Sequence, residues 1–393
     1  MARVRKKQFI DTNVWEESKK RVHYIYDNFD KVIVSFSGGK DSTAVLQTVL
    51  EVKKERGISE PLEVVFFDEE AIHPTTIEYV DRVSKWKDVD LKWYCLEFKH
   101  RNACSNESPW WYNWEKDKKD IWVREMPEQA ISEHPKFKKG MTIPDFSDLL
   151  YKRSEGRVAM LTGIRTEESL RRHKVIASKK HDSYIAQSSR GYATFMCHPI
   201  YDWTSKDVWI AVSKFGWDYN KTYDRYNQTK LHGRWLTQRV CPPFGEEPVR
   251  GLWLFSECFP EMWHKMLNRV PGVSTAWRYG NSELYSNAKT KPDNMSYKEY
   301  LNVLLDSYGL KHRNQVKHNI NKYIKQHYNK TNDKFTDDTP HPLTGMSWRF
   351  CCRCAMRGDF KGRQADYLTS ESNRELKRLD MTLEEARVRY GKR

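Results

Sequence analysis

The sequence predicts an α/β fold, in which a parallel sheet carries helices on both faces, followed by a mainly helical C-terminal domain. Three observations lead to this prediction: short apolar runs alternate with segments of helical periodicity, a glycine-rich turn joins the first run to the first such segment, and the composition changes near residue 241. Alternating strands and helices indicate a parallel sheet, because each parallel strand is reached through a crossover connection.

Each element of the sheet is predicted from its own pattern. Four short runs rich in apolar residues are predicted as strands, at residues 31–36, 62–67, 91–95 and 157–162. Residues 43–53 place apolar side chains at helical spacing, and Pro74 suits the first turn of a second helix. Further along, Thr204 and Asp207 have the spacing of a capping box and predict another helix start.

Residues 100–150 interrupt this alternation with many charged residues and several tryptophans. We interpret them as an insertion over the carboxyl edge of the sheet. Their cluster Trp110-Trp111-Tyr112-Asn113-Trp114 is either a platform that stacks a base or a packed lid over the site at that edge, and we favour packing. The later change of composition divides the chain into a first domain at 1–240 and a helical domain at 241–393.

The composition excludes several classes of protein. The chain has 393 residues, of which 38% are hydrophobic and 13% aromatic, so it can build a sizeable core rather than remain disordered. No apolar run reaches the roughly 20 residues that a transmembrane helix needs. The basic start Met1–Lys7 has no apolar stretch behind it. We therefore expect no membrane span, no secretory signal and a cytoplasmic location.

The net charge of +15 points to polyanionic partners, nucleic acid first. A possible helix after residue 310 places Arg313, Lys317 and Lys325 on one face, with Lys322 nearby. Such a face can follow a phosphate backbone, but a solvated helix face is at least as good an interpretation. Binding of DNA or RNA stays an open prediction, as does assembly with a second copy or a partner protein.

A phosphate-binding loop is predicted at Ser37-Gly38-Gly39-Lys40-Asp41-Ser42, between the first strand and the first helix. The glycines let the backbone turn and approach a ligand closely, and the amides at the start of the helix form an anion site. Lys40 adds a positive charge, and the serines add hydroxyl donors. The loop is not a Walker A motif, because residue 34 is Val where that motif has Gly. Asp41 beside a phosphate is explained if it caps the helix or holds a metal ion.

This loop resembles that of the N-type ATP pyrophosphatases, and three later segments resemble the phosphoadenylylsulfate (PAPS) reductase branch of the same superfamily. They are Phe66-Phe67-Asp68-Glu69-Glu70 with His73-Pro74, Gly163-Ile164-Arg165-Thr166-Glu167-Glu168-Ser169 with Arg171-Arg172, and His198–Trp209. The resemblance implies the adenine nucleotide alpha hydrolase fold. It also implies an adenine nucleotide as ligand, either ATP or the adenylylated sulfates PAPS and APS.

The resemblance also implies roles for individual residues. Those expected to bind the nucleotide are Ser35, Phe36, Ser37, Gly38, Gly39, Lys40, Asp41, Ser42, Phe67, Asp68, Glu69, Gly163, Arg165, Arg171 and Arg172. Asp68, at the end of a strand, is expected to orient Mg²⁺ or a ribose. Lys40, Asp41 and Arg165 are the implied catalytic residues, in an attack on the α-phosphate of ATP that uses Mg²⁺ and releases pyrophosphate.

The cysteines set this chain apart from the PAPS reductases, whose C-terminal Glu-Cys-Gly-x-x-His-type segment is missing here. Cys351-Cys352-Arg353-Cys354 resembles in part the cluster ligands of adenylylsulfate reductases, and Cys241 is a distant candidate for a fourth ligand. Two interpretations stay open. The four cysteines hold a [4Fe–4S] cluster or Zn²⁺, or the trio is reduced and packed in a helical turn.

A weaker resemblance covers Gly272–Tyr285, which is similar to a phage- and prophage-associated branch of the superfamily. The favoured hypothesis is adenylyl transfer of the ATP pyrophosphatase type, coupled to sulfur transfer or to modification of a nucleic acid. One alternative is a reductase of an adenylylated sulfate that uses a C-terminal cysteine. Another is a non-enzymatic regulator that binds DNA in response to a nucleotide.

Overall fold

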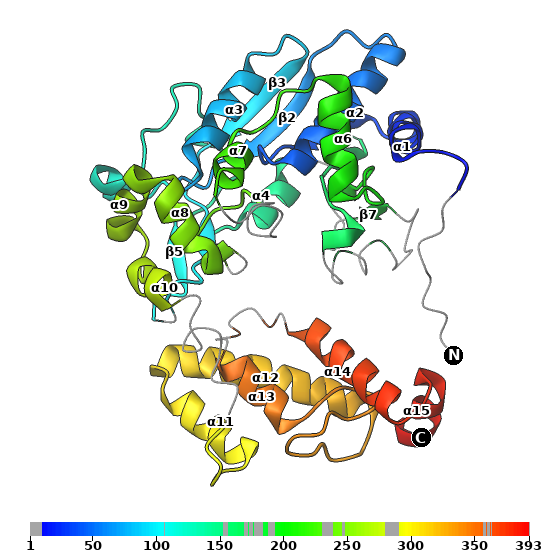
Figure 1. Cartoon of the computed structure of the whole chain (residues 1–393), viewed down its shortest axis with the longest axis vertical. Coiled ribbons are helices and arrows are strands. Elements are labelled where there is room, and N and C mark those ends of the chain that lie inside the picture. The colour runs from blue at the N-terminus through cyan, green and yellow to red at the C-terminus, as the bar shows by residue number, and fades with distance from the viewer. Residues whose placement is uncertain are drawn as a thin grey trace. The chain divides into compact units, whose positions relative to one another are not determined.

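The computed structural model describes residues 10–105, 107–151, 156–168, 172, 176, 184–187, 193–229, 239–245, 248–279, 291–356, 359, 362 and 364–392. The chain forms two compact units (Figure 1). One consists of Ile10–Cys104 and Trp110–Arg278 and is called the sheet unit below. The other consists mainly of Tyr279–Arg393 and is called the C-terminal unit.

Among the described residues, the sheet unit is built on six strands in the order β3–β2–β1–β6–β8–β7. Their bounds are β1 Lys31–Ser35, β2 Leu62–Phe67, β3 Val89–Tyr94, β6 Val158–Leu161, β7 Ile185–Gln187 and β8 Thr194–Cys197. Neighbouring strands are parallel except for the edge strand β7, which is antiparallel to β8. The predicted α/β class is confirmed, and the antiparallel edge is a feature that the sequence pattern did not indicate.

Strand β1 marks the place where the order of the strands reverses. From β1 the chain adds β2 and β3 on one side and then crosses back to place β6 on the other. Val34 accordingly pairs with both Val64 of β2 and Leu161 of β6. Open α/β sheets bind ligands at such a switch point, beyond the carboxyl ends of the strands. The predicted phosphate-binding loop starts at this point, because it follows β1 directly.

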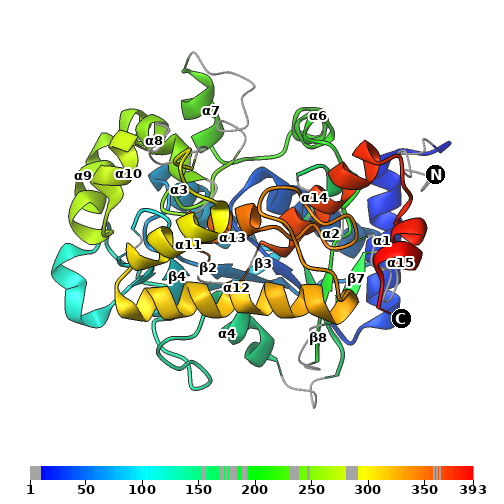
Figure 2. The ribbon, with the colours of Figure 1, turned by 90° about the horizontal axis from the view of Figure 1, so that it is seen from below.

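Successive strand residues face opposite sides of the sheet, so each side has its own core. Val34 and Phe66 pack into one core, while Ile33 and Met160 pack into the other. The helices of the first core are α1 Val14–Asn28, α2 Lys40–Glu55, α3 Pro74–Ser84 and α6 Ser205–Phe215, and the second core includes α4 Ile143–Leu150 (Figure 2). The prediction of helices on both faces is therefore confirmed.

The start of α6 has the predicted capping box. The Thr204 side chain accepts from the Asp207 amide at 3.1 Å, and the Asp207 carboxylate accepts from the Thr204 amide at 2.6 Å. Both amides belong to the first turn, where the helix itself offers no acceptor. The box thus fixes where α6 begins, as the sequence spacing predicted.

The insertion after β3 packs on the carboxyl edge of the sheet, as predicted. It contains β4 Lys99–Arg101 and β5 Trp110–Tyr112, which pair antiparallel, and the 3-10 turn η1 Lys116–Ile121. Trp111 and Trp114 are buried. The Trp114 indole donates to the carbonyl of Asp68, directly after β2, at 2.9 Å. This supports the packing interpretation of the tryptophan cluster over a role in stacking a base.

The sheet unit continues beyond residue 240. Before this residue it also contains η3 Thr166–Glu168 and α7 Thr222–Asn227. After it come η5 Pro248–Gly251, α8 Leu252–Cys258 and α9 Pro260–Arg269, and α10 Val273–Tyr279 ends at the boundary of the units. Arg269 of α9 is buried and binds both carboxylate oxygens of buried Glu70, at 2.8 and 2.9 Å. This ion pair joins α9 to the carboxyl edge of the sheet. The first compact unit therefore extends to Arg278, and the domain boundary at residue 240 stays a prediction.

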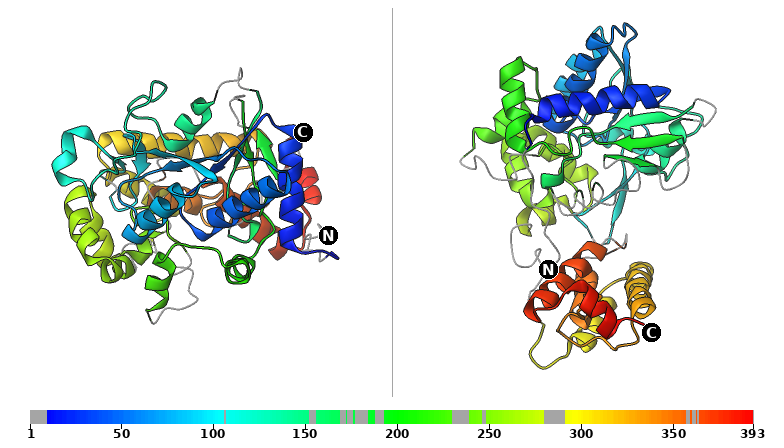
Figure 3. Two further views of the ribbon diagram at one scale, coloured as in Figure 1. Left: turned by 90° about the horizontal axis from the view of Figure 1, so that it is seen from above. Right: turned by 90° about the vertical axis from the view of Figure 1, so that its right-hand side faces the viewer.

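The C-terminal unit is helical, as predicted. Its helices are α11 Tyr297–Asp306, α12 Leu310–Lys330, α13 Trp348–Met356, α14 Ala365–Arg378 and α15 Leu383–Tyr390, and α12 is the long yellow-to-orange helix in Figure 3. Its core contains Val316 and Ile320 of α12 together with Phe350 of α13. No helix among the described residues of either unit combines the length and the apolar character needed to cross a membrane.

Candidate functional site

Residues distant in sequence hold the loop Ser37–Ser42 in place. Gly38 has a φ of +70°, and an added Cβ would lie 2.8 Å from Thr76 Cγ2, so glycine is required here. Asn220 donates its amide to the Gly38 carbonyl at 2.8 Å. The Lys40 amide donates to the Tyr223 hydroxyl at 2.9 Å, across 183 residues of sequence. The loop is therefore fixed from outside, by the segment that leads into α7.

The two serines of the loop bind each other. The Ser42 hydroxyl donates to the Gly39 carbonyl at 2.9 Å, and the Ser37 and Ser42 oxygens are 3.1 Å apart. Because Ser42 has a single hydroxyl proton, the Ser37 hydroxyl is the donor between them. The Ser37 amide also donates to Ser42 Oγ at 3.2 Å. This network keeps the loop compact at the N-terminus of α2, where backbone amides favour an anion.

A cleft of about 360 Å³ opens beside this loop, at the carboxyl ends of β1, β2 and β6. Nine predicted residues line it: Ser35, Ser37, Gly39, Asp41, Ser42, Phe67, Glu69, Gly163 and Arg172. Its volume lies within the range of about 300–1,000 Å³ that is usual for small-molecule sites. The structure thus brings segments from three strand ends together in one candidate site.

Gly163 lets the segment after β6 approach the loop closely. An added Cβ at this position would lie 2.6 Å from the Asp41 carbonyl carbon and 2.7 Å from the Ser42 amide nitrogen. Both neighbours are backbone atoms of the first turn of α2, so they cannot move without shifting the helix. Gly163 therefore joins two walls of the cleft, which is the close backbone approach that glycine permits.

The three predicted catalytic residues form one ion-pair network. Asp41 accepts from Arg165 Nε at 2.7 Å and from Lys40 Nζ at 3.1 Å, through different carboxylate oxygens. Arg165 also pairs with Glu167 at 2.9 Å. Lys40 and Arg165 are buried and do not line the cleft, whereas Asp41 does. Burial, together with the nearby charges of Arg165 and Arg239, lowers the pKa of Lys40, although Asp41 opposes this shift.

Two other arginines line the cleft itself, Arg172 and Arg239. Arg172 pairs with Glu168, which also lines the cleft. Burial and the neighbouring charge of Arg239 lower the pKa of Arg172. Like charges that are held this close favour an anion between them, because the anion relieves their repulsion. The positive charge that faces a ligand therefore comes from Arg172 and Arg239. Lys40 and Arg165 instead bind Asp41 without lining the cleft.

Asp68 does not take the position we expected for a ligand of Mg²⁺ or ribose. It is buried and is not among the residues that line the cleft. One carboxylate oxygen accepts from the Trp93 indole at 2.8 Å and the other from the Glu70 amide at 2.9 Å, and both contact Arg124 of the insertion. The carboxylate thus fastens the insertion to the end of β2. The same strand end presents Phe67 and Glu69 to the cleft instead.

Two other predicted residues, Phe36 and Gly38, support the loop without lining the cleft. Phe36 is buried and packs on Tyr79 of α3, with ring centroids 5.8 Å apart. Arg171 lies outside the described residues. Of the arginine pair on this segment, only Arg172 can therefore be placed at the cleft.

The predicted metal-binding cysteines are divided between the two units. Cys241 lines the cleft of the sheet unit. Cys351, Cys352 and Cys354 lie on α13 and are buried in the apolar core of the C-terminal unit. Burial raises the pKa of Cys352 to about 12, and it also raises the pKa of Cys351 and Cys354. Metals bind the thiolate, so burial opposes the form that a metal needs.

The described residues contain no group of three or more His, Cys, Asp or Glu side chains arranged to hold a metal ion. The Cys352 thiol instead donates to the carbonyl of Tyr297 in α11, at 2.9 Å. As arranged, the described cysteines do not fit a [4Fe–4S] cluster or Zn²⁺, and the three on α13 pack in the apolar core. No chemical step is derived from such a centre.

Sequence reasoning missed several residues of the cleft. Tyr223, Arg239, Thr162 and Ile72 line it, and Asn220 supports its loop. Thr162 was within a predicted strand end, so its position at the carboxyl edge of the sheet could have been inferred. Tyr223 and Arg239 lie in segments without strand or helix periodicity, and only the folded chain brings them to the loop.

Comparison with known proteins identifies the family. A model described as the phosphoadenosine phosphosulfate reductase domain matches residues 31–230, about half of the chain. The matched range contains the loop Ser37–Ser42, the carboxyl ends of β1, β2 and β6, and Gly163. The chain belongs to this PAPS reductase domain family. A second model, a domain of unknown function designated DUF3440, matches residues 234–347. These two matches meet near residue 230, close to the sequence-based division at 240.

A full-length relative is the uncharacterized protein YbdN of Escherichia coli K12, which is 29% identical over 384 residues, 92% of each chain. Among solved structures, the FMN adenylyltransferase of Candida glabrata matches with a TM-score of 0.35 and 15% identity, over 55% of this chain and 58% of its own. The PAPS reductase of Candida auris matches with a TM-score of 0.30 and 14% identity, over 58% of this chain and 98% of its own. Likenesses of this extent are no basis for assigning an activity.

Proposed function

We propose that this protein binds ATP in the cleft of the sheet unit and transfers its adenylyl group to an acceptor. The observation that carries this proposal is the position of the loop Ser37–Ser42. It lies at the switch point of the sheet and at the N-terminus of α2, facing a cleft lined by Arg172 and Arg239. Membership of the PAPS reductase domain family supports an adenine nucleotide as the ligand.

In the proposed reaction an oxygen atom of the acceptor attacks the α-phosphorus of ATP. A new phosphorus–oxygen bond forms, the bond to the bridging oxygen between the α- and β-phosphates breaks, and pyrophosphate leaves with that electron pair. The amides at the start of α2 and the guanidinium groups of Arg172 and Arg239 stabilise the charge that develops on the phosphates. Lys40 and Arg165 are assigned a positioning role, because both bind Asp41 and neither lines the cleft.

The side chains of the cleft do not fit a resident Mg²⁺ ion. Among the described residues, the carboxylates that line it are Asp41, Glu69 and Glu168. Asp41 is paired with Lys40 and Arg165, Glu168 with Arg172, and Glu69 with His100 at 3.1 Å. Each carboxylate is thus already engaged by a basic side chain. In our proposal Mg²⁺ therefore belongs to the substrate, as the ion that accompanies ATP, and no step is assigned to it.

The test is ATP binding, followed by isothermal titration calorimetry, together with pyrophosphate release in the presence of candidate acceptors. Arg239→Ala is expected to weaken ATP binding roughly tenfold to a hundredfold, as expected for loss of a charged hydrogen bond. Arg56→Ala is the matched control. It removes the same charge from the far end of α2, where Arg56 pairs with Asp27 on the surface. ATP binding that is equal in both variants would contradict the assignment of the cleft.

Acceptors are distinguished by the pyrophosphate assay. We propose, more specifically, that the acceptor of the adenylyl group is a nucleic-acid base or a group that receives sulfur. Pyrophosphate that forms only when RNA or DNA is added would support a nucleic-acid acceptor. Wild-type protein that binds ATP but releases no pyrophosphate with any acceptor would leave nucleotide sensing as the function of this cleft and exclude transfer.

One observation favours a second candidate function, reduction of an adenylylated sulfate. Cys241 lines the nucleotide cleft, whereas the three C-terminal cysteines are buried in the core of the other unit. In this reaction the Cys241 thiolate attacks the sulfate sulfur, a sulfur–sulfur bond forms, and the sulfur–oxygen bond to the nucleotide phosphate breaks. An external dithiol then reduces the product and releases sulfite.

This second candidate is tested by sulfite formation from PAPS or APS in the presence of a dithiol protein. Cys241→Ser is expected to abolish sulfite formation, and Cys352→Ser, which alters the C-terminal core instead, is the matched control. Wild-type protein that forms no sulfite from either nucleotide would exclude the reductase. If Cys352→Ser loses sulfite formation and Cys241→Ser keeps it, the nucleophile is one of the C-terminal cysteines instead.

A further inference from the structure

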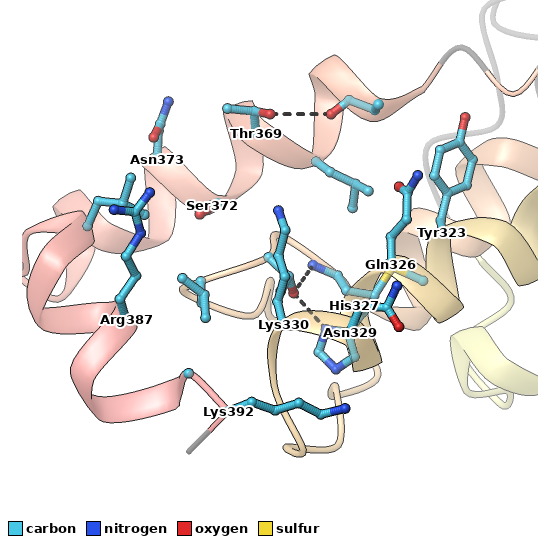
Figure 4. Close-up of a pocket in the computed structure, with 17 residues that line it drawn as sticks. Tyr323, Gln326, His327, Asn329, Lys330, Thr369, Ser372, Asn373, Arg387 and Lys392 are labelled. Atoms are coloured by element: carbon cyan, nitrogen blue, oxygen red, sulfur yellow. Dashed lines mark hydrogen bonds between the residues drawn. The ribbon is translucent and has the colours of Figure 1, made fainter.

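The C-terminal unit has a groove of its own, separate in its residues from the nucleotide cleft. It has a volume of about 650 Å³ and is lined by α12, α14, α15 and the segment between α12 and α13 (Figure 4). Its apolar lining residues include Leu343, Met346 and Leu368, and they are called its floor below. The rim carries exposed polar side chains, among them Gln326, Asn329, Thr369 and Asn373.

The charges of this groove are all of one sign. Lys330, Arg387 and Lys392 line it, and no Asp or Glu is among the described residues that line it. All three cations are exposed, and within the described parts of the chain no carboxylate forms an ion pair with them. The Lys392 amide donates to the Lys330 carbonyl at 2.9 Å, which places two of the cations on adjoining backbone segments.

The single histidine of the lining does not add to this charge. Burial lowers the pKa of His327, so its imidazole is neutral at physiological pH. Its Nε2 lies 2.8 Å from the Asp333 carbonyl, which only accepts, so Nε2 carries the proton. Its Nδ1 accepts from the Thr344 hydroxyl at 2.7 Å. Both ring nitrogens are thus satisfied within the protein, and His327 fixes the loop that forms the floor.

We propose that this groove binds single-stranded nucleic acid. The three cations suit the phosphates of a strand, since no carboxylate of a described residue forms an ion pair with them. The apolar floor suits the face of an unpaired base, and the amides of Gln326, Asn329 and Asn373 offer both donors and acceptors to base edges. A duplex would contact only the charges at the rim, because its bases are paired and stacked inside the double helix and cannot reach the apolar floor. This site is independent of the nucleotide cleft and of the function proposed for it.

The proposal differs from the helix face predicted from the sequence. Lys317, Lys322 and Lys325 are exposed on α12, but none of them lines the groove. Arg313, predicted on the same face, pairs with Asp306 at 3.1 Å. The C-terminal unit therefore offers two sets of three lysine or arginine charges, one at the groove and one on α12 outside it. The second set is a control for charge alone.

The experiment measures the fluorescence anisotropy of a labelled strand of about 12 nucleotides, within the usual single-strand site size. The full-length variant K330A/R387A/K392A is compared with the full-length variant K317A/K322A/K325A. We expect the groove variant to bind at least about tenfold more weakly and to reduce the slope of log affinity against log salt by about 2. The control variant is expected to change affinity by less than about threefold, from the lost net charge alone.

Four outcomes would overturn the proposal. They are no binding by the wild type at low salt, equal losses in the two variants, equal affinity for a duplex of the same sequence, or equal competition by poly-glutamate of the same charge. The three groove residues are exposed and make no ion pair among the described residues, so their substitution should leave the fold intact. The unfolding temperature of the groove variant is compared with that of the wild type. If it is unchanged, a weaker affinity reflects lost contacts with the strand and not a damaged fold.

Discussion

The cleft of the sheet unit and the groove of the C-terminal unit hold their positive charges in opposite ways. Behind the cleft, Arg165 is 3% exposed and pairs with Asp41 and Glu167. In the groove, Lys330 and Arg387 are exposed, and the described lining residues include no carboxylate. A buried charge must be paired to be tolerated, whereas an exposed charge remains solvated at little cost. The two sites therefore differ in how far their geometry is fixed before a ligand arrives.

This difference matches the ligands proposed for the two sites. The cleft is preorganised, because its loop is fixed by Asn220 and Tyr223 and its charges by a network around Asp41. Such a site suits one small ligand whose phosphates take a single position. The groove has flexible lysine and arginine side chains, which suit a polymer whose phosphates are approached one at a time. Three experiments with substituted proteins test this contrast, and they follow from the largest expected effect to the smallest.

Replacing one arginine in each site gives the largest contrast. Arg165→Ala removes two charged hydrogen bonds, to Asp41 and to Glu167, while Lys40 still pairs with Asp41, so we expect a loss of about 3 kcal/mol in the free energy of unfolding. Arg387→Ala on the exposed rim should change it by less than about 0.5 kcal/mol. Urea denaturation followed by tryptophan fluorescence measures the first effect, because all tryptophans except Trp348 precede residue 279. Similar small losses in both variants would show that the cleft is no more preorganised than the groove.

Glycine substitutions test the contrast at the level of the backbone. Gly163→Ala places a Cβ 2.6–2.8 Å from backbone atoms of Asp41 and Ser42, so it should displace one wall of the cleft. We expect a destabilisation of about 1–3 kcal/mol, as for other overpacked sites, together with weaker ATP binding. Gly309→Ala, before α12, meets nothing within 4 Å and should be neutral. Calorimetric ATP binding that survives in Gly163→Ala would contradict the close approach of these segments.

The pH dependence of stability tests the burial of the sheet unit's histidines. Burial lowers the pKa of His198 to about 4 and that of His73 to about 3, from an ordinary value of 6.5. The unfolded chain therefore binds more protons between these values, and stability should fall as the pH drops below about 6.5. From about pH 7 to about pH 5, each histidine should cost roughly 2 kcal/mol.

The measurement is the free energy of unfolding at several pH values, by urea denaturation. His198→Gln keeps a side chain that can bond to Thr162, which now lies 2.7 Å from His198 Nδ1, but it does not titrate. Its stability should fall less steeply than that of the wild type over this pH range. A parallel pH profile for the two proteins would mean that His198 is not held neutral.

Much of the fold followed from sequence patterns because those patterns are local. The strands β1, β2, β3 and β6 are short apolar runs, and their helices have clear periodicity, so all were predicted close to their observed bounds. Strand β7 was not predicted, since it has three residues and pairs antiparallel at the edge. The loop Ser37–Ser42 was predicted because its glycines, the strand before it and the helix after it are all recognisable in one continuous stretch of sequence.

The rest of the candidate site depends on contacts between distant segments. Tyr223 and Arg239 reach the cleft from segments without strand or helix periodicity, so no pattern in the sequence marked them. Asp68 was assigned to a ligand from its place at a strand end. Its side chain instead binds Arg124 and Trp93, and the direction of a single side chain depends on neighbours that only folding supplies. For the same reason, the sequence did not indicate that Cys241 and the C-terminal cysteines belong to different compact units.

Protection of Cys241 by ATP tests the central claim most directly. Cys241 lines the cleft, and Cys258, which is also partly exposed, does not, so the two thiols can be compared within one sample by maleimide labelling and peptide mass spectrometry. Burial raises the pKa of Cys241, so labelling is best done at about pH 9. If ATP occupies the cleft, ATP at 100 times its Kd should slow labelling of Cys241 about a hundredfold and leave Cys258 unchanged. Equal labelling of Cys241 with and without ATP would contradict nucleotide binding in this cleft.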